Sequence, residues 1–448
     1  MNHKDIHRRF LRNAGMFMGS RVVFGLLNLG TNAIILRSFG AADLGMLLLL
    51  VAYLRVFAEV LKFDSWQAVL RFGVIAAENT DNARLRRLLG LTIGVDLTAM
   101  LTGILVSILL LPQAAVWFGW GEQISRLAPW FMILIVFVTH ATPNGVMRLF
   151  DRVEVLALQH GLNATIRLAL VLLAIVLGGG VHHLAMAWAG GFIISASMTM
   201  IVCARELMKR DLIPKVSLRF RRTAAQFPGI WHFLLMSNLL TIAPLAINHL
   251  TTLLVGAQLG ATQAAALQLA RQFSTGLSSP ARMLGALLLP DFSRLSGHGN
   301  WAGLRDVLKQ QFKVTTISVL GLGVVLFAVL PLVIEALFGA EMLVHVWLFR
   351  LMLIAALINI LTFSLYHALF SANKGGTALL IEIFGMAVYA VILLAGLPGM
   401  GLIAAGVATI AFSATSRGLA LFIGGRLLKK RIRRARRAAA DAGAHPPA

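Results

Sequence analysis

The sequence contains very little cysteine and lacks the short motifs that mark most enzymes. Cys203 is its single cysteine, which excludes an internal disulfide and any metal site built from cysteines. There is no Gly-rich phosphate loop of the Walker type, no nucleophile elbow and no zinc-hydrolase helix motif. The histidines also lack the spacing of metal ligands. We therefore expect no metal, no cofactor and no catalytic residues, and hence no enzyme.

Charged residues are scarce as well. They make up 13% of the 448 residues, whereas 58% are hydrophobic, and the mean hydropathy is +0.82. A soluble globular protein has about a quarter of its residues charged. Continuously apolar tracts of about 20 residues recur from end to end, and this is the length that crosses a bilayer as a helix. Because these tracts do not alternate, a closed barrel is excluded. The sequence predicts an all-α polytopic membrane protein.

About twelve tracts satisfy this length criterion. Their approximate ranges are 15–37, 44–62, 88–111, 128–148, 160–179, 184–204, 230–256, 264–289, 314–337, 346–370, 376–397 and 401–424. Lys and Arg fall almost entirely in alternate loops, as the positive-inside rule requires if both termini are cytoplasmic. The net charge of +22 then mostly reflects orientation, and nucleic acid is not an expected partner. The basic N-terminus leads to no small-residue cleavage site, so we predict no removable signal peptide.

A basic linker, 206–229, divides the sequence into an N-terminal lobe, 1–205, and a C-terminal lobe, 230–425, followed by a basic tail, 426–448. The lobes resemble each other. "LAMAWAGGFIISA" at Leu184 matches "LIAAGVATIAFSA" at Leu402, and "FGAADLG" at Phe39 matches "LGATQAA" at Leu259, about 220 residues apart in both cases. Six spans per lobe predict a parallel repeat about a pseudo-two-fold axis along the membrane normal, with the substrate between the lobes. The alternative to an internal repeat is that small residues and leucines in membrane helices match by chance.

Arginines inside the predicted spans are the main functional signal, because an arginine at mid-bilayer costs from about 2.5 to over 10 kcal/mol. They are Arg21, Arg55, Arg167, Arg271, Arg282, Arg350 and Arg417. In the tract 264–289, polar residues follow one another at steps of three and four, which places them on one helical face. These residues are Gln268, Arg271, Thr275, Ser278 and Arg282.

Similar but shorter polar stripes occur on three other spans. Their members are Arg21, Asn28 and Asn32; His160, Asn163 and Arg167; and Asn238, Thr241 and Asn248. We predict that these faces line a hydrated cationic cavity between the lobes, which would bind an anion such as phosphate or carboxylate. The alternative is snorkelling to the headgroups, open for Arg21, Arg282 and Arg55 and preferred for Arg350 and Arg417.

Acidic residues inside the spans are few. Glu59, Asp96 and Glu382 are candidates to carry a coupling proton or sodium ion. Each can equally be the counter-ion of a nearby arginine. We prefer the counter-ion interpretation for Glu59, because Arg55 lies one helical turn before it.

Two regions of the sequence are similar to a known family. "LRSFGAADLG" and "FDSWQAVLRFG" in the first 73 residues, and "HLTTLLVGAQLGATQAAALQLARQFSTGLSSPARMLGALLLPDFSRL" in the second half, with its Ala270-Arg271 and Pro290-Asp291 pairs, resemble bacterial oligosaccharide and polysaccharide flippases. These include O-antigen flippases and belong to the multidrug/oligosaccharidyl-lipid/polysaccharide exporter superfamily. No strict motif defines the family, and the recognisable pattern covers these two regions only.

The resemblance implies a flippase of the bacterial inner membrane that serves surface polysaccharide and lipopolysaccharide assembly. Such a protein moves an oligosaccharide on undecaprenyl diphosphate to the outer leaflet by alternating access of its two lobes. Membrane lipids and a polysaccharide polymerase are the implied partners, and we expect a lateral opening beside the first and eighth spans. The expected substrate-binding residues are Arg21, Asn28, Arg55, Arg167, Gln268, Arg271 and Arg282.

Three alternatives stay open. A drug or organic-cation antiporter of the same superfamily would need acidic and aromatic residues in the cavity, where this sequence offers mostly arginine. A peptidoglycan-precursor flippase typically has two additional helices, which we do not find. A membrane enzyme such as a polysaccharide polymerase usually has a large outer loop or soluble domain, which is absent here.

Overall fold

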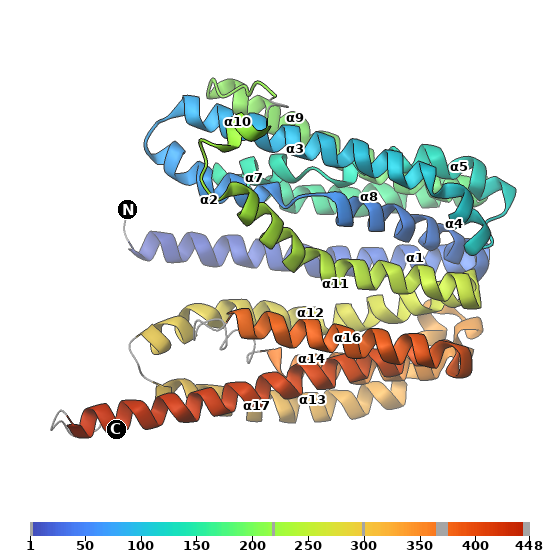
Figure 1. Ribbon diagram of the computed structural model, residues 1–448. Coiled ribbons are helices and arrows are strands. Elements are labelled where there is room, and N and C mark those ends of the chain that lie inside the picture. The colour runs from blue at the N-terminus through green and yellow to red at the C-terminus, as the bar shows by residue number, and fades with distance from the viewer. Residues whose placement is uncertain (1–2, 217–219, 298–300, 364–374, 442–448) are drawn as a thin grey trace. The chain divides into compact units, whose positions relative to one another are not determined.

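The computed structural model describes residues 3–216, 220–297, 301–363 and 375–441 (Figure 1). Within these ranges the side chains of 3–22, 123, 221, 239–247, 280–291, 293, 296–297, 375 and 435–441 are not described. All regular secondary structure in the described ranges is helical. The predicted fold class, an all-α polytopic membrane protein, is confirmed.

The chain packs as two compact units, Met1–Gln268 and Leu269–Ala448. The helices of the first unit are α1 (His3–Leu61), α2 (Ser65–Glu78), α3 (Asn82–Leu109), α4 (Leu111–Trp117), α5 (Glu122–Met132), α6 (Ile135–Val138), α7 (Ala141–Leu149), α8 (Val153–Val176), α9 (Val181–Lys209), α10 (Phe220–Ala224) and α11 (Ile230–Leu259). The division falls inside α12 (Ala261–Gly297). The second unit continues with α13 (Trp301–Phe338), η1 (Ala340–His345), α14 (Val346–Leu361), α16 (Gly375–Met400) and α17 (Ile403–Asp441).

Each of the twelve predicted ranges falls largely on a helix or on a broken helix. Among the described residues, eight stretches are long and apolar enough to cross a membrane, and a ninth is added if the bent pair Ile124–Met132 and Ile135–Leu149 counts as one span. The first stretch, Val23–Glu78, contains two predicted spans, because α1 bends sharply at Gly40. The basic tail from 426 onward continues α17 as far as Asp441.

Three glycines make the sharp breaks between helices. Gly40 has φ 87° and ψ 169°, Gly260 has φ 96° and ψ 172°, and Gly339 has φ 86° and ψ 169°. This backbone region is essentially restricted to glycine. Gly40 and Gly260 are the glycines of the two turns that the repeat predicted to correspond, and they share this backbone conformation with Gly339. The lobe boundaries themselves remain a prediction.

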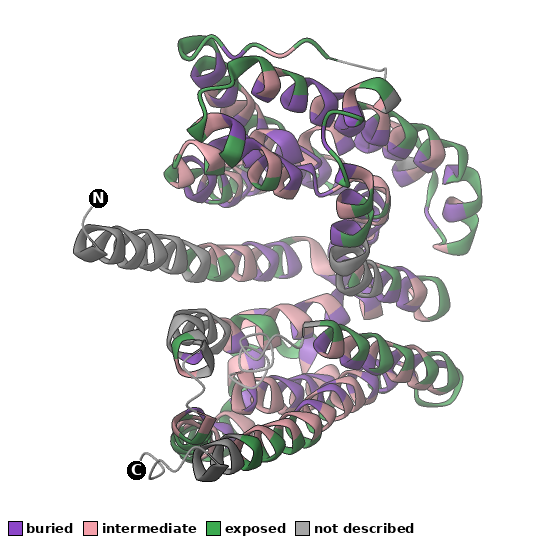
Figure 2. Cartoon of the chain, turned by 60° about the vertical axis from the view of Figure 1, so that its left-hand side comes forward, coloured by how far each residue is buried: buried purple, intermediate pink, exposed green. Residues whose placement is uncertain are grey.

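The core of the first unit lies where α2 and α7 pack together at one end. A Cβ added to Gly145 on α7 would lie 2.9 Å from the Cα atom of Trp66, so only glycine allows this approach. Buried residues of α3, α9 and α11, among them Leu88, Leu207 and Leu234, complete the cluster together with Phe227, which lies between α10 and α11. Figure 2 shows buried residues on the faces by which the helices of each unit pack on one another.

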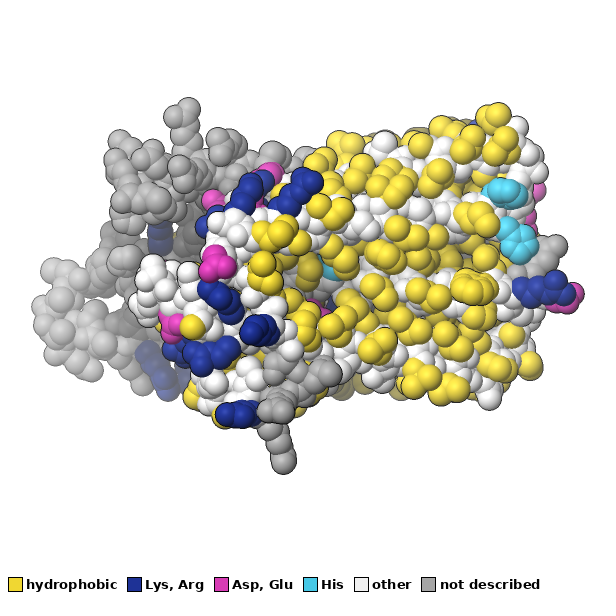
Figure 3. Space-filling view, turned by 90° about the horizontal axis from the view of Figure 1, so that it is seen from above, with side chains coloured by type: hydrophobic (Ala, Val, Ile, Leu, Met, Phe, Trp, Pro, Cys, Tyr) yellow, Lys and Arg dark blue, Asp and Glu magenta, His cyan; other side chains and the backbone are white. Residues whose placement is uncertain are grey.

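One face of the first unit carries an apolar band. Figure 3 shows hydrophobic side chains across the middle of this face, with Lys and Arg gathered at one end. Exposed large apolar residues on α3 and α8 include Leu101, Leu105, Leu158, Leu173 and Val176. Such a surface is stable only against lipid, because soluble proteins rarely expose contiguous apolar patches of this kind. The chain is therefore a multi-pass membrane protein.

Candidate functional site

The last two turns of α1 and the residue that directly follows the helix hold three charged side chains together. Arg55 Nη1 lies 3.5 Å from Glu59 Oε1, and the ammonium group of Lys62 pairs with the other carboxylate oxygen of Glu59. The Glu59 side chain is only 9% exposed. These spacings of three and four residues put both cations one turn from the carboxylate. The predicted Arg55–Glu59 counter-ion pair is confirmed, and Lys62 is a further partner that the sequence analysis did not assign.

Arg167 on α8 lies deeper in the same unit. It is 9% exposed, its guanidinium carbon lies 4.3 Å from the centre of the Trp188 ring on α9, and its buried Nε has no hydrogen-bond acceptor among the described residues. Arg55 lies 5.2 Å from the ring of Phe192, one turn further along α9. The two guanidinium groups are close enough to repel each other. Helix α9 therefore brings two arginines from different helices onto neighbouring aromatic rings.

Small and polar residues make the approach of α8 and α9 possible. A Cβ at Gly191 would lie 3.1 Å from the backbone oxygen of Asn163 and 3.4 Å from Arg167 Cβ. The side-chain amide of Asn163 donates to Ser195 Oγ at 3.3 Å. The predicted stripe of α8 thus faces α9, and a larger residue at position 191 would push the Arg167 backbone away from the Trp188 ring.

Asp96 on α3 joins the beginnings of two short helices. Its carboxylate accepts hydrogen bonds from Ser65 Oγ at 2.6 Å, from the backbone N–H of Thr142 at 2.9 Å and from Thr142 Oγ1 at 2.6 Å. Ser65 begins α2 and Thr142 lies in the first turn of α7. Carboxylates are favourable at helix N-termini, where backbone N–H groups lack partners. The structure therefore gives this ion-coupling candidate a bonding role between α2 and α7.

In the second unit, Arg271 on α12 donates from Nη2 to the hydroxyl of Tyr389 on α16 at 2.7 Å. Ser274 donates to the carbonyl oxygen of Met352 on α14 at 2.9 Å. Thr275 is exposed, and Ser278 donates to the carbonyl oxygen of Ser274 on its own helix at 3.0 Å. The predicted polar stripe of α12 is thus partly engaged with neighbouring helices of its own unit.

Arg417 on α17 differs from the expectation that it would reach the headgroups. Its Nη1 lies 3.2 Å from Glu382 Oε1 on α16, and its Nε donates to Asn359 Oδ1 on α14 at 3.2 Å. Asn359 in turn donates to Ser413 Oγ at 3.2 Å. The snorkelling prediction for Arg417 is wrong, because partners on two neighbouring helices compensate its charge inside the unit. Glu382, an ion-coupling candidate, is the counter-ion.

The predicted substrate-binding residues therefore fall into separate groups. Arg55 and Arg167 meet in the first unit, and Arg271 lies in the second. Asn28 on α1 is half-buried, and its buried Oδ1 has no partner among the described residues. Gln268 is half-buried at the end of the first unit. The side chains of Arg21 and Arg282 lie outside the described residues.

Sequence reasoning missed the aromatic part of the site. Trp188 and Phe192 are four residues apart on a span that was assigned no polar stripe. Their spacing places both rings on one face, but nothing in the sequence shows which helix this face meets. Within the described ranges, no group of three or more His, Cys, Asp or Glu side chains is placed to hold a metal ion.

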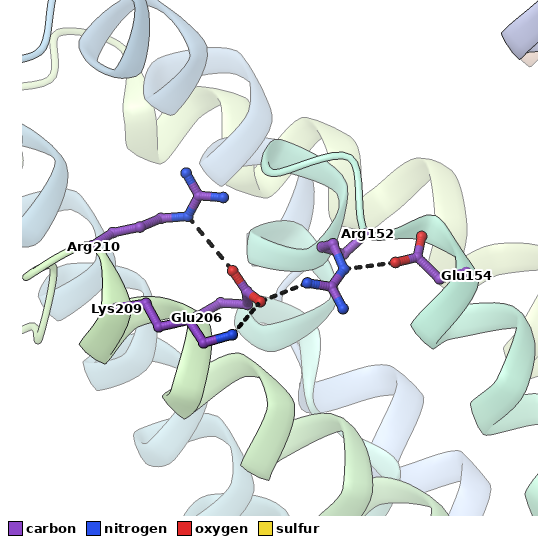
Figure 4. A network of polar contacts seen from close by, with 5 residues as sticks. All are labelled: Arg152, Glu154, Glu206, Lys209 and Arg210. Atoms are coloured by element: carbon purple, nitrogen blue, oxygen red, sulfur yellow. Dashed lines mark hydrogen bonds and ion pairs between the residues drawn. The ribbon is translucent and has the colours of Figure 1, made fainter.

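A second charged cluster lies where the start of α8 meets the end of α9 (Figure 4). Arg152 donates to Glu154 and to Glu206, at 2.6 Å in each case. Glu206, at the end of α9, also lies 3.8 Å from Lys209 Nζ and 3.7 Å from Arg210 Nε. The hydrogen bond to Glu154 and the charge of Glu206 raise the pKa of the Arg152 guanidinium above its ordinary value. This cluster ties the start of α8 to the end of α9.

No family model matches the chain. Over 288 residues, which is 64% of this chain, the sequence is 27% identical to the inner membrane protein YghQ of Escherichia coli strain K12, and the match covers 81% of that protein.

Several solved structures are similar. An inward-facing multidrug resistance MATE family transporter of the MOP superfamily has a TM-score of 0.71 at 14% identity and covers 94% of this chain and 95% of its own. The lipid II flippase MurJ in an inward closed conformation has a TM-score of 0.71 at 14% identity and covers 91% and 86%. The Vibrio cholerae MATE transporter VcmN in its bent form has a TM-score of 0.55 at 14% identity and covers 94% and 98%. The chain therefore has the all-helical, two-lobe fold of these transporters.

Proposed function

We propose that the protein is a flippase of the bacterial inner membrane that moves a lipid-linked oligosaccharide from the cytoplasmic to the outer leaflet. The group that it recognises is the diphosphate between lipid and sugar. The observation that carries this proposal is Arg167, a buried guanidinium whose Nε has no hydrogen-bond acceptor among the described residues and which lies near a second guanidinium, Arg55.

The charge balance around Arg167 favours an anionic ligand. Arg55, Lys62 and Arg167 contribute three positive charges, and Glu59 contributes one negative charge. An uncompensated charge inside an apolar unit costs several kcal/mol. A diphosphate offers many acceptor oxygens and more than one negative charge, and arginine binds such groups through paired N–H donors. A carrier of this kind also removes most of the cost of taking a diphosphate and sugars through hydrocarbon.

The comparisons support this assignment in outline. MurJ, named as a lipid II flippase, has a similar fold, and YghQ is named as an inner membrane protein. Together with the resemblance to O-antigen-type flippases, they favour a lipid-linked substrate over a free solute. We propose both termini in the cytoplasm, since Lys and Arg fall almost entirely in alternate loops of the sequence. A polysaccharide polymerase is the proposed partner for using the flipped product.

A drug or organic-cation antiporter is the second candidate, because several similar structures are MATE transporters. Binding of a cation would need a carboxylate that is available to it. Glu59 is paired with Lys62 and Arg55, Asp96 accepts three hydrogen bonds, and Glu382 is paired with Arg417. These three candidate carboxylates are thus already engaged, whereas Arg167 has spare donor capacity.

The test is translocation in liposomes. Purified full-length protein is reconstituted with an undecaprenyl-diphosphate oligosaccharide that carries a fluorophore on the sugar, and a membrane-impermeant quencher reports which leaflet holds it. We expect the wild type to move the lipid without changing its mass and Arg167→Ala to lose this activity. Arg126→Ala, which removes an exposed arginine paired only with Glu122 on its own helix, is the control and should behave like the wild type.

Two outcomes would contradict the proposal. Uptake of an organic cation without movement of the labelled lipid would identify the antiporter. A change in the mass of the lipid-linked sugar would identify a membrane enzyme.

A further inference from the structure

The ion pairs of the buried Glu59 carboxylate do not connect two helices. Its two ion-pair partners are Arg55, four residues before it on α1, and Lys62, three residues after it and directly past the end of α1 at Leu61. The ion pairs therefore join no two helices, although His249 of α11 adds a favourable electrostatic contribution. A buried carboxylate that joins no elements gives up its hydration without an obvious gain in stability.

The two cations that pair with Glu59 are also the ones that a bound phosphate would contact. Arg55 also faces Phe192 of α9, and α9 carries the Trp188 ring on which Arg167 lies. Removal of the Glu59 charge would leave three positive charges, on Arg55, Lys62 and Arg167, next to a ligand. In the structure described here, Glu59 occupies the place that an anionic ligand would take at Arg55 and Lys62.

The two contacts differ in strength. Charge-assisted hydrogen bonds of guanidinium or ammonium groups to carboxylates are about 2.7–2.9 Å long, whereas Arg55 Nη1 lies 3.5 Å from Glu59 Oε1. Arg55 makes a long contact through one nitrogen and keeps its other donors available, and its side chain is 31% exposed. Lys62 makes the close contact. An incoming anion therefore meets Arg55 first and separates it from Glu59 at little cost.

We propose that Glu59 is a built-in competitor of the substrate, a resident counter-ion that the diphosphate displaces on binding and that returns to Arg55 and Lys62 when the diphosphate leaves. This inference rests on the proposed function and adds how the site releases its ligand. A site of several cations alone would bind a diphosphate tightly and release it slowly. An internal carboxylate weakens binding and speeds release, which a carrier needs in order to turn over.

The proposal predicts opposite effects on binding and on transport. Replacing Glu59 with glutamine removes the competing charge while keeping the size of the side chain. Charges a few ångströms apart in a partly desolvated site interact strongly, so even partial relief of this competition gives about tenfold tighter binding. Transport should become slower, because release becomes limiting.

The experiment uses the purified full-length protein and inorganic pyrophosphate as the probe, with binding measured by isothermal titration calorimetry. We expect Glu59→Gln to bind about tenfold more tightly than the wild type and Glu59→Asp, which draws the carboxylate back from Arg55, to fall between them. Glu154→Gln is the matched control, because it removes a half-exposed carboxylate paired with Arg152 at the end of the unit and should leave binding unchanged. In the liposome assay, Glu59→Gln should move labelled lipid more slowly than the wild type.

The possible failures are distinguishable. If the wild type binds pyrophosphate and moves the lipid, but Glu59→Gln binds pyrophosphate equally or more weakly, the competitor role is overturned and the proposed function stands. If neither protein binds pyrophosphate, the proposed phosphate site is contradicted, and so is the competitor role of Glu59. Should Glu59→Gln fail to fold, Glu59→Asp decides, since binding no tighter than that of the wild type overturns the competitor role.

Discussion

Arg167 and Arg417 form a matched pair for testing what a buried charge does in this protein. Both lie on membrane-spanning helices, but Arg417 bonds to Glu382 and Asn359, whereas the Nε of Arg167 has no hydrogen-bond acceptor among the described residues. Replacing Arg167 with methionine removes the desolvation penalty of a buried cation, several kcal/mol, and loses a cation–π contact with Trp188 worth about 1–2 kcal/mol. We expect Arg167→Met to unfold with a free energy equal to or about 1–3 kcal/mol above that of the wild type.

Arg417→Met should have the opposite effect. It leaves the carboxylate of Glu382 without its counter-ion and Asn359 Oδ1 without a donor. Breaking a fully buried ion pair costs about 3–5 kcal/mol. The side chains of Arg417 and Glu382 are 19% and 22% exposed, so solvent screens part of this loss, and we expect a destabilisation of about 2 kcal/mol.

The assay combines thermal unfolding of the purified variants, followed by tryptophan fluorescence, with translocation in liposomes. Arg167→Met should melt at or above the wild-type temperature and lose transport, whereas Arg417→Met should melt at a lower temperature. The reasoning would be refuted if Arg167→Met melted well below the wild type while Arg417→Met did not. Arg167 would then be a structural residue, and no anion-binding role would be needed to explain it.

Three further predictions follow from particular contacts. Gly40→Ala forces a side chain into a backbone region reserved for glycine and should destabilise the protein by about 1–3 kcal/mol, whereas Gly25→Ala, in helical backbone with open space around it, should be neutral or stabilising in the same unfolding measurement. Asp96→Ala leaves three donors at the starts of α2 and α7 without an acceptor and should cost about 3 kcal/mol or more, seen as a lower yield of folded protein and a lower melting temperature. Arg271→Ala should abolish translocation at a normal membrane level, and Tyr389→Phe, which removes the hydroxyl that binds Arg271, should reduce it more mildly; unchanged transport in both would remove Arg271 from the substrate path.

The spans could be predicted because membrane crossing imposes one simple length rule. The breaks inside them could not. The tract 128–148 reads as one continuous apolar run, but the structure divides it into parts of α5, α6 and α7, with a bend of 51° between the two helical portions. Hydropathy averages over such breaks, and the acceptor that stabilises the start of α7 is Asp96, far away in sequence on α3.

The candidate site was predictable only where its contacts are local. Arg55 and Glu59 lie one turn apart on one helix, so their pairing follows from helix geometry. The partner of Arg417 is 35 residues away on another helix, and the aromatic neighbour of Arg167 is on α9. Helical periodicity shows which residues share a face but not which helix that face meets. The sequence therefore could not predict the partners of Arg167 and Arg417, because tertiary packing determines them.

The glycine connectors link the sequence repeat to packing within the first unit. The Gly40 and Gly260 turns share nearly the same φ and ψ, and the helices that follow them come into direct contact. A Cβ at Gly45 would overlap the backbone carbonyl of Ala261, and a Cβ at Gly256 would overlap the side chain of Leu49. Corresponding segments of the two predicted repeats thus pack against each other through backbone that no larger residue could replace. Gly339 has nearly the same angles outside the two matched turns, so it is the contact between the two turns, and not their backbone angles alone, that favours the repeat over chance similarity.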